Sequence, residues 1–145
     1  MVSNKLEIKK NNLLKALKSL ESALRIAPDN SILIDDLNWE DEEDVELDLK
    51  RNGLLQKFEY TVELLWKTIQ NDYKENGIIF DTPKEVLRSA FSKTNLSDQE
   101  KVQILKMIDH RNTIAHEYKD FIMKEIYPLI PNYFVLMKKL FTEFF

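Results

Sequence analysis

Glycine and proline are scarce in this chain: its 145 residues include two glycines and four prolines. These residues interrupt helices and form the tight turns that a many-stranded β fold needs at short intervals. A chain with so few of them favours long helices joined by few connections. Because 43% of the residues are hydrophobic and 32% are charged, the composition is that of a globular protein and not of a disordered segment. We expect a single domain over residues 1–145.

Apolar residues recur at helical spacing, and no segment is a convincing strand. Asn76-Gly77 is a typical helix end, and Ser97 followed by Glu100 has the pattern of a capping box. Pro128 and Pro131 should kink or break the last helix. The predicted fold is therefore all-α, a bundle of four long helices and one short helix. The predicted helices cover 4–26, 43–75, a short stretch that begins at Asp81-Thr82-Pro83, 98–115 and 119–143.

The charge of the chain limits the classes of function that it can have. The net charge is −4 and the acidic residues gather between Asp35 and Asp48, so the chain is not a general nucleic-acid coat protein and we expect no DNA partner. The acidic run from Asp41 to Asp44 is either a solvated loop or the first turn of the second helix. Residues 28–40 should form a connection with a small apolar patch at 32–34.

The sequence also predicts where the protein resides. Without cysteine, it has neither disulfides nor thiolate chemistry nor a Cys-ligated zinc site. Residues 1–24 lack the apolar core of a signal peptide, and no stretch approaches the roughly 18 apolar residues of a membrane span. We therefore expect a cytoplasmic protein that makes no contact with a membrane.

The densest polar group near a predicted helix end extends from Asp109 to Tyr118. On one unbroken helix, Arg111 and Tyr118 would share a face about 20° apart, whereas Arg111 and His116 would point about 140° apart. Asn112 and His116 would be neighbours, four residues apart. Arg111 and His116 can then grip one phosphate in two ways. Either the helix breaks near His116, or two copies of the motif meet across a dimer axis.

These residue types suit a narrow chemistry. Arginine binds a phosphate with a planar fork, histidine transfers protons near pH 7, and asparagine orients either group. Together they fit RNA cleavage in which a 2′-hydroxyl attacks the adjacent phosphate. That reaction needs no metal, the sequence has no HExxH motif or paired His/Asp cluster, and we expect neither a metal nor a cofactor. From the residues alone a structural role stays open, because Arg and His near a last turn also complement the helix dipole.

The segment from Arg111 to His116 resembles the Arg-x4-His motif of HEPN domains, and with Tyr118 it resembles the form seen in HepT-like toxins. Residues 57–68 and 82–91 resemble the nucleotidyltransferase substrate-binding proteins. This resemblance covers nearly the whole chain. It implies a five-helix, up-and-down antiparallel bundle that forms a homodimer, together with a minimal nucleotidyltransferase as partner.

The resemblance also implies roles for the motif residues. Arg111 and His116 would be catalytic, Asn112 would support them, and the partner would transfer AMP from ATP onto Tyr118. Such a group would add bulk and negative charge beside Arg111 and should block an RNA phosphate. Three functions stay open: a metal-independent ribonuclease toxin whose substrate is RNA, a non-catalytic subunit that binds a nucleotide or substrate for the nucleotidyltransferase, and a purely structural dimer.

Overall fold

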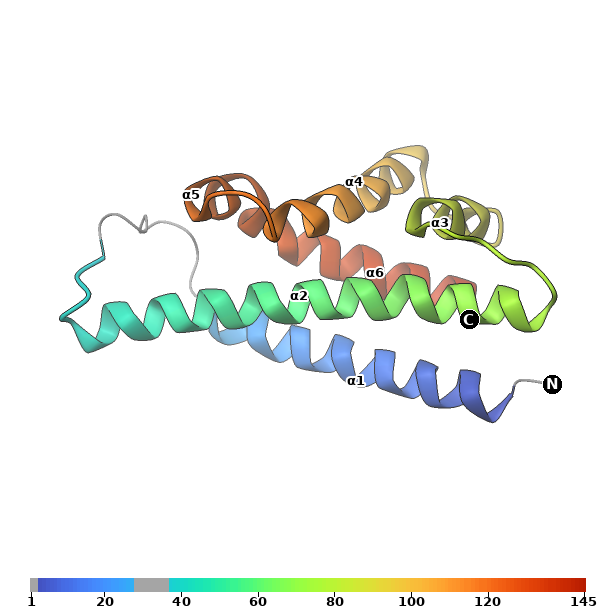
Figure 1. Cartoon of the computed structure of the whole chain (residues 1–145), viewed down its shortest axis with the longest axis horizontal. Coiled ribbons are helices and arrows are strands. Elements are labelled where there is room, and N and C mark those ends of the chain that lie inside the picture. The colour runs from blue at the N-terminus through green and yellow to red at the C-terminus, as the bar shows by residue number, and fades with distance from the viewer. Residues whose placement is uncertain (1–2, 28–36) are drawn as a thin grey trace.

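The computed structural model describes residues 3–27 and 37–145, and these ranges contain helices and no strands (Figure 1). The all-α prediction is thereby confirmed, whereas the apolar patch expected at 32–34 lies outside the described residues. The elements in chain order are α1 (Asn4–Ile26), α2 (Glu42–Glu75), α3 (Pro83–Phe91), α4 (Asp98–Ile114), α5 (Lys119–Phe121), the π-helical turn η2 (Ile122–Ile126), the 3-10 turn η3 (Tyr127–Leu129) and α6 (Ile130–Phe144).

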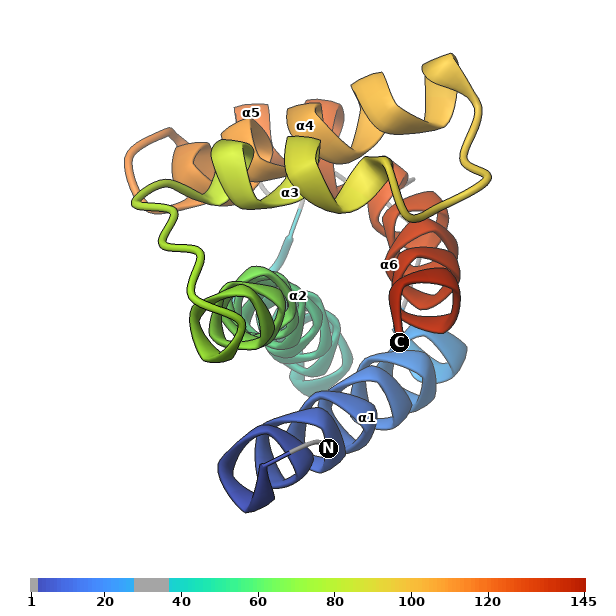
Figure 2. The same cartoon turned by 90° about the vertical axis from the view of Figure 1, so that its right-hand side faces the viewer.

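The long helices pack as an antiparallel bundle. In Figure 1, α1 and α2 lie side by side and run in opposite directions, and so do α4 and α6. The turned view in Figure 2 shows α3 and α4 crossing over α2, with α1 and α6 on the remaining sides. The short helix α3 lies between α2 and α4 in the chain, as the sequence predicted.

Each of the helices α1 to α4 begins with an N-cap residue whose side chain accepts a backbone hydrogen bond. The hydroxyl of Ser3 accepts from the Leu6 amide, and Asp41 accepts from the Glu43 amide. Asp41 is therefore the N-cap of α2 and the acidic run is its first turn, where carboxylates meet the positive end of the helix dipole. Both capping boxes are complete, at the start of α3 and at the start of α4.

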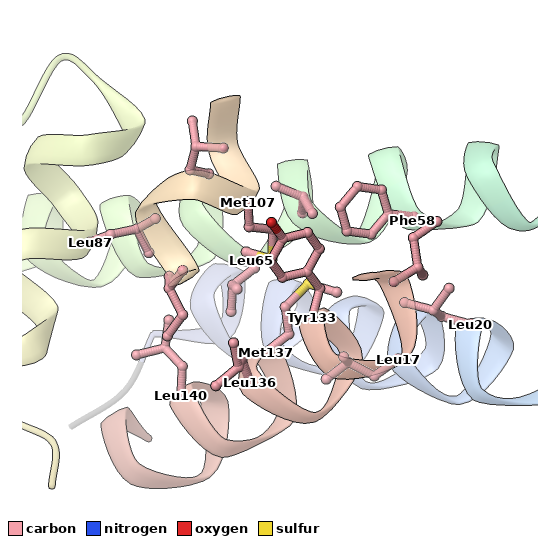
Figure 3. Packing of buried hydrophobic residues seen from close by; sticks show 14 of the residues in the cluster. Leu17, Leu20, Phe58, Leu65, Leu87, Met107, Tyr133, Leu136, Met137 and Leu140 are labelled. Carbon is pink, nitrogen blue, oxygen red and sulfur yellow. The ribbon is translucent and has the colours of Figure 1, made fainter. Parts of the chain in front are cut away.

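The core lies between α1, α2, α3, α4 and α6 (Figure 3). The ring of Phe58 stacks on the ring of Tyr133, with centroids 5.8 Å apart, and this contact joins α2 to α6. Fully burying each large apolar side chain contributes about 1.5–3 kcal/mol. The stripe predicted for the second helix is confirmed, because all its members are at most 2% exposed: Leu54, Phe58, Val62, Leu65 and Ile69.

The last predicted helix, 119–143, is broken near its prolines. One helical turn, α5, is followed by η2 and η3, and regular α-helix resumes only at Ile130. Pro128 lies inside η3 and Pro131 in the first turn of α6. Proline has no amide hydrogen to donate and clashes with the preceding turn, so the α-helical ladder cannot pass through it. The expected break is confirmed, although its π-helical form was not predicted.

Candidate active site at the end of helix α4

Helix α4 ends just before the motif histidine. Its last residue is Ile114, and Ala115 is the C-cap. The backbone amides of His116 and Glu117 then both donate to the carbonyl of Thr113, each over 3.0 Å, which closes the helix with a tight turn. Of the two arrangements the sequence allowed, a break near His116 is therefore present in the single chain.

The end of α4 removes the condition of an unbroken helix under which these face relations were derived. Tyr118 is the N-cap of α5 and has extended backbone, so it lies outside the helix that carries Arg111, whereas Asn112 and His116 lie on either side of the end of α4. Asn112 is exposed on the last turn of α4, and His116 is exposed on the following turn. No hydrogen bond joins the side chains of Arg111 and His116 in the described part of the chain.

Arg111 points from α4 toward α2. Its side chain is 29% exposed, and its Nη2 lies 3.6 Å from Oε2 of Glu63. The Nε of Arg111 is buried and has no hydrogen-bond partner among the described residues. A buried donor without an acceptor costs about 1–3 kcal/mol, so such a group needs an explanation. A planar guanidinium with a vacant donor is suited to bind an oxyanion.

Two carboxylates of α2 surround this guanidinium. Glu63 accepts from Trp66 Nε1 over 3.1 Å and pairs with Lys67 over 3.1 Å. Burial raises the pKa of Glu63, but these hydrogen bonds and the charge of Arg111 outweigh it and hold the pKa below its usual value. Burial likewise raises the pKa of Glu59, and the charge of Arg111 only partly opposes that rise. A phosphate at Arg111 therefore has to compete with Glu63.

The segment after α4 places the motif tyrosine on the protein surface. The side chain of Tyr118 is 87% exposed and makes no capping hydrogen bond to α5. Lys119, the next residue, is fixed by an ion pair of 2.6 Å between its Nζ and Oδ1 of Asp48 on α2. This contact anchors the turn at its far end while leaving the phenol accessible.

A hollow of about 380 Å³ separates the motif turn from α2. Its α2 wall includes Asn52, Gln56 and Glu59, and its other wall includes Glu117 and Lys119. Two carboxylates and one ammonium line it, so the hollow is not a general anion site.

The second histidine, His110, has a structural role. Its Nδ1 lies 2.7 Å from the hydroxyl of Tyr133 on α6. Burial lowers the pKa of His110, followed by the charge of Lys106, so the imidazole is neutral in the fold. Burial and then Asp109 raise the pKa of Tyr133 to about 12, so the phenol keeps its proton, and it donates to Nδ1 when the imidazole proton is on Nε2.

A protein family and a solved structure are similar to almost the whole chain. The family model described as "Nucleotidyltransferase substrate binding protein like" matches residues 9–144. The chain belongs to this family. A crystal structure of a protein from Thermus thermophilus is similar to this nucleotidyltransferase substrate-binding-like chain, with 27% sequence identity and a TM-score of 0.67. The similarity covers 91% of this chain and 98% of that one. No curated protein matches the chain.

The structure adds residues of this substrate-binding-like protein that sequence analysis did not single out. Glu63 and Glu59 contact or face Arg111 from another helix. Their four-residue spacing on one face of α2 was a usable signal, because it continues to Lys67. In residues 3–27 and 37–145, no group of three or more His, Cys, Asp or Glu residues could hold a metal ion. No helix in those ranges is long and apolar enough to cross a membrane.

Proposed function

We propose that this chain is the helical subunit of a two-component nucleotidyltransferase–HEPN system and that it cleaves RNA without a metal ion. The buried Arg111 Nε, which has no partner beside the exposed turn that carries His116, is the observation that carries this proposal. The family description and the Arg111–Tyr118 motif support it. Asn112, exposed on the last turn of α4, orients the substrate or the imidazole.

In the proposed reaction, His116 takes the proton from a ribose 2′-hydroxyl, whose oxygen attacks the adjacent phosphorus. The bond from phosphorus to the 5′-oxygen breaks, that oxygen takes up a proton from water, and His116 returns its proton to the solvent. The products are a 2′,3′-cyclic phosphate and a 5′-hydroxyl. Arg111 stabilises the negative charge that develops on the phosphoryl oxygens.

We propose that a homodimer completes the site. Within one chain Arg111 packs toward α2 whereas His116 lies on the exposed turn, and no hydrogen bond joins the two side chains in the part that is described. A two-fold axis beside the turn would bring the motif of a second copy against the first. Such an isologous contact is the commonest way in which soluble proteins assemble.

The proposed partner is a nucleotidyltransferase that transfers AMP from ATP onto Tyr118. The phenol oxygen forms a bond to the α-phosphorus, pyrophosphate leaves, and the phenolic proton passes to the solvent. The 87% exposure of Tyr118 supports access by a second protein. The added phosphate places a negative charge on the segment that carries the motif and opposes binding of RNA there.

The test uses purified protein in which intact mass spectrometry shows Tyr118 to be unmodified. Mixed RNAs are incubated with excess chelator, and the 3′ ends are analysed for cyclic phosphate. Arg111→Ala and His116→Ala should each lower the cleavage rate by about 100-fold or more. Arg88→Ala, which removes an exposed arginine of α3, should cleave like the wild type. Intact RNA with the unmodified protein, or full activity in either motif variant, would refute the proposal.

A second candidate is a non-catalytic subunit that binds a nucleotide for the nucleotidyltransferase. Glu63 and Glu59 beside Arg111 favour it, because they disfavour a polyanion at this point. This function predicts that the chain co-purifies with its partner and leaves RNA intact. Calorimetry with ATP and with the partner separates the two candidates.

A further inference from the structure

A groove of about 370 Å³ lies between α1 and α2, on the face of α2 next to the motif side. Lys15 of α1 and Lys57 of α2 line it, and the Nζ of Lys57 is held 2.6 Å from the hydroxyl of Ser19. Tyr60 also lines the groove, and its side chain is 60% exposed. None of the described residues that line it is a carboxylate. This is an unusual wall in a chain with a net charge of −4.

More lysines continue this wall toward the start of α1 and the end of α2. Burial lowers the pKa of Lys9, and the charges of Lys5, Lys74 and Lys67 lower it further, with Glu75 in opposition. Four ammonium groups from two helices are therefore close enough to repel one another. Repulsion of this kind opposes folding, and an anion that binds there relieves it. We call these six lysines the lysine strip: Lys5, Lys9, Lys15, Lys57, Lys67 and Lys74.

The lysine strip adjoins the proposed active site. Glu63 contacts Lys67 on one side and Arg111 on the other, over 3.1 and 3.6 Å. Gln56 lines both the α1–α2 groove and the hollow beside the motif turn. From Lys57 to Lys74 the helix extends about 25 Å, which exceeds the length of one nucleotide. A polyanion on the strip would therefore lead to the guanidinium of Arg111.

We propose that the lysine strip and Tyr60 bind the segment of a single-stranded RNA that flanks the phosphate held at Arg111. The ammonium groups contact successive phosphates, and the exposed ring of Tyr60 stacks on a base. Lysines supply sequence-independent affinity by releasing counterions, and aromatic rings accept any base. This inference rests on the proposed function, since it supplies the substrate-binding surface of that same site.

Fluorescence anisotropy tests the inference with a labelled single-stranded RNA 12-mer and the His116→Ala chain, which leaves the probe intact. Adding Lys9→Gln and Lys15→Gln should weaken binding about tenfold at 0.1 M salt and lower the slope of log affinity against log salt by about 1.4. Tyr60→Ala should weaken binding about fivefold or more. The matched control is Lys106→Gln with Lys138→Gln, which removes two exposed lysines outside the strip and should leave the affinity unchanged.

The outcomes separate the lysine strip from the catalytic proposal. If the strip and control variants lose affinity equally, the strip is refuted while cleavage stands. The same follows if Lys9→Gln with Lys15→Gln binds RNA like the His116→Ala chain and, when His116 is present, cleaves RNA at the wild-type rate. If the strip variants alone lose affinity and the wild type cleaves nothing, the strip stands and the catalytic proposal falls. Full displacement of the RNA by ATP at the same nucleotide concentration would also refute an extended site.

Discussion

Glu63 lies between Lys67 of the lysine strip and Arg111 of the candidate site, and it contacts both. Its carboxylate accepts from Trp66 and pairs with both Lys67 and Arg111. In the free protein the Glu63 carboxylate partly neutralises the positive charge of Arg111, to which a phosphate would bind. Glu63 thus makes the guanidinium selective for ligands that bind it better than a carboxylate at 3.6 Å does.

Replacing this carboxylate should make Arg111 available. Glu63→Gln keeps an oxygen that can accept from Trp66 but removes the negative charge. A partly exposed ion pair is worth about 0.2–1 kcal/mol, so RNA should bind up to about fivefold more tightly to the variant in anisotropy titrations made with His116→Ala. Glu46→Gln, an exposed glutamate at the start of α2, is the control. An affinity that does not increase would show that Arg111 receives no phosphate.

At the residue scale, the sequence identified Arg111, Asn112, His116 and Tyr118 through the motif that they form. It did not identify Glu63, because a contact between α2 and α4 depends on how these helices pack. The shared face of Arg111 and Tyr118 applied only to an unbroken helix, and α4 ends at Ile114, before Tyr118.

At the scale of elements, α4 is fixed at its start by a capping box that also reaches α6. The Glu100 amide donates to Ser97 Oγ over 3.1 Å, and its carboxylate accepts from the amide of Ser97 and from Lys139 Nζ. The start of α4 was predictable because the box is local in sequence. The π-helical turn η2 was not, because the steps of three and four residues between apolar positions in 119–143 fit an uninterrupted α-helix.

Removing the cap should loosen α4 as a unit. Ser97→Ala deletes the acceptor for the Glu100 amide and should lower the free energy of unfolding by about 1 kcal/mol. Urea denaturation followed by circular dichroism measures the change. Ser22→Ala, at an exposed position inside α1, should not destabilise the protein, because alanine favours the helix interior. Equal midpoints for Ser97→Ala and the wild type would contradict the role given to the cap.

At the scale of the whole molecule, the contact between His110 and Tyr133 makes the bundle sensitive to pH. The pKa of His110 is lowered from 6.5 in the fold, mainly by burial, so the unfolded chain takes up a proton first as the pH falls. Above pH 6.5 the imidazole is mostly neutral in both the folded and the unfolded chain, and its contribution to the free energy of unfolding is fully present. It declines between 6.5 and the lower pKa of the folded state.

His110→Gln should remove this contribution. The wild type should lose more of its free energy of unfolding between about pH 7 and pH 5 than the variant, as measured by thermal or urea denaturation at each pH. His116→Gln replaces an exposed histidine and should retain the decline of the wild type. Parallel pH profiles for the wild type and His110→Gln would show that the half-buried imidazole does not set the pH dependence of the free energy of unfolding.

The overall architecture was predictable because the hydrophobic periodicity is long and seldom interrupted. The first predicted helix matches α1, and the second differs from α2 by one residue at its start. The crossing of α3 and α4 over α2 (Figure 2) could not be predicted from the sequence, because it depends on side-chain packing between distant segments.

The end of α4 at Ile114 gives the two parts of the motif different tolerance to changes of length. One residue inserted before Arg111 within the helix would rotate that guanidinium by about 100° and carry it away from α2. One residue inserted after Ala115 would lengthen an exposed stretch and leave the arginine in place. The arginine is thus held in register by a helix that packs on α2, whereas the tyrosine depends only on the exposed segment that follows that helix.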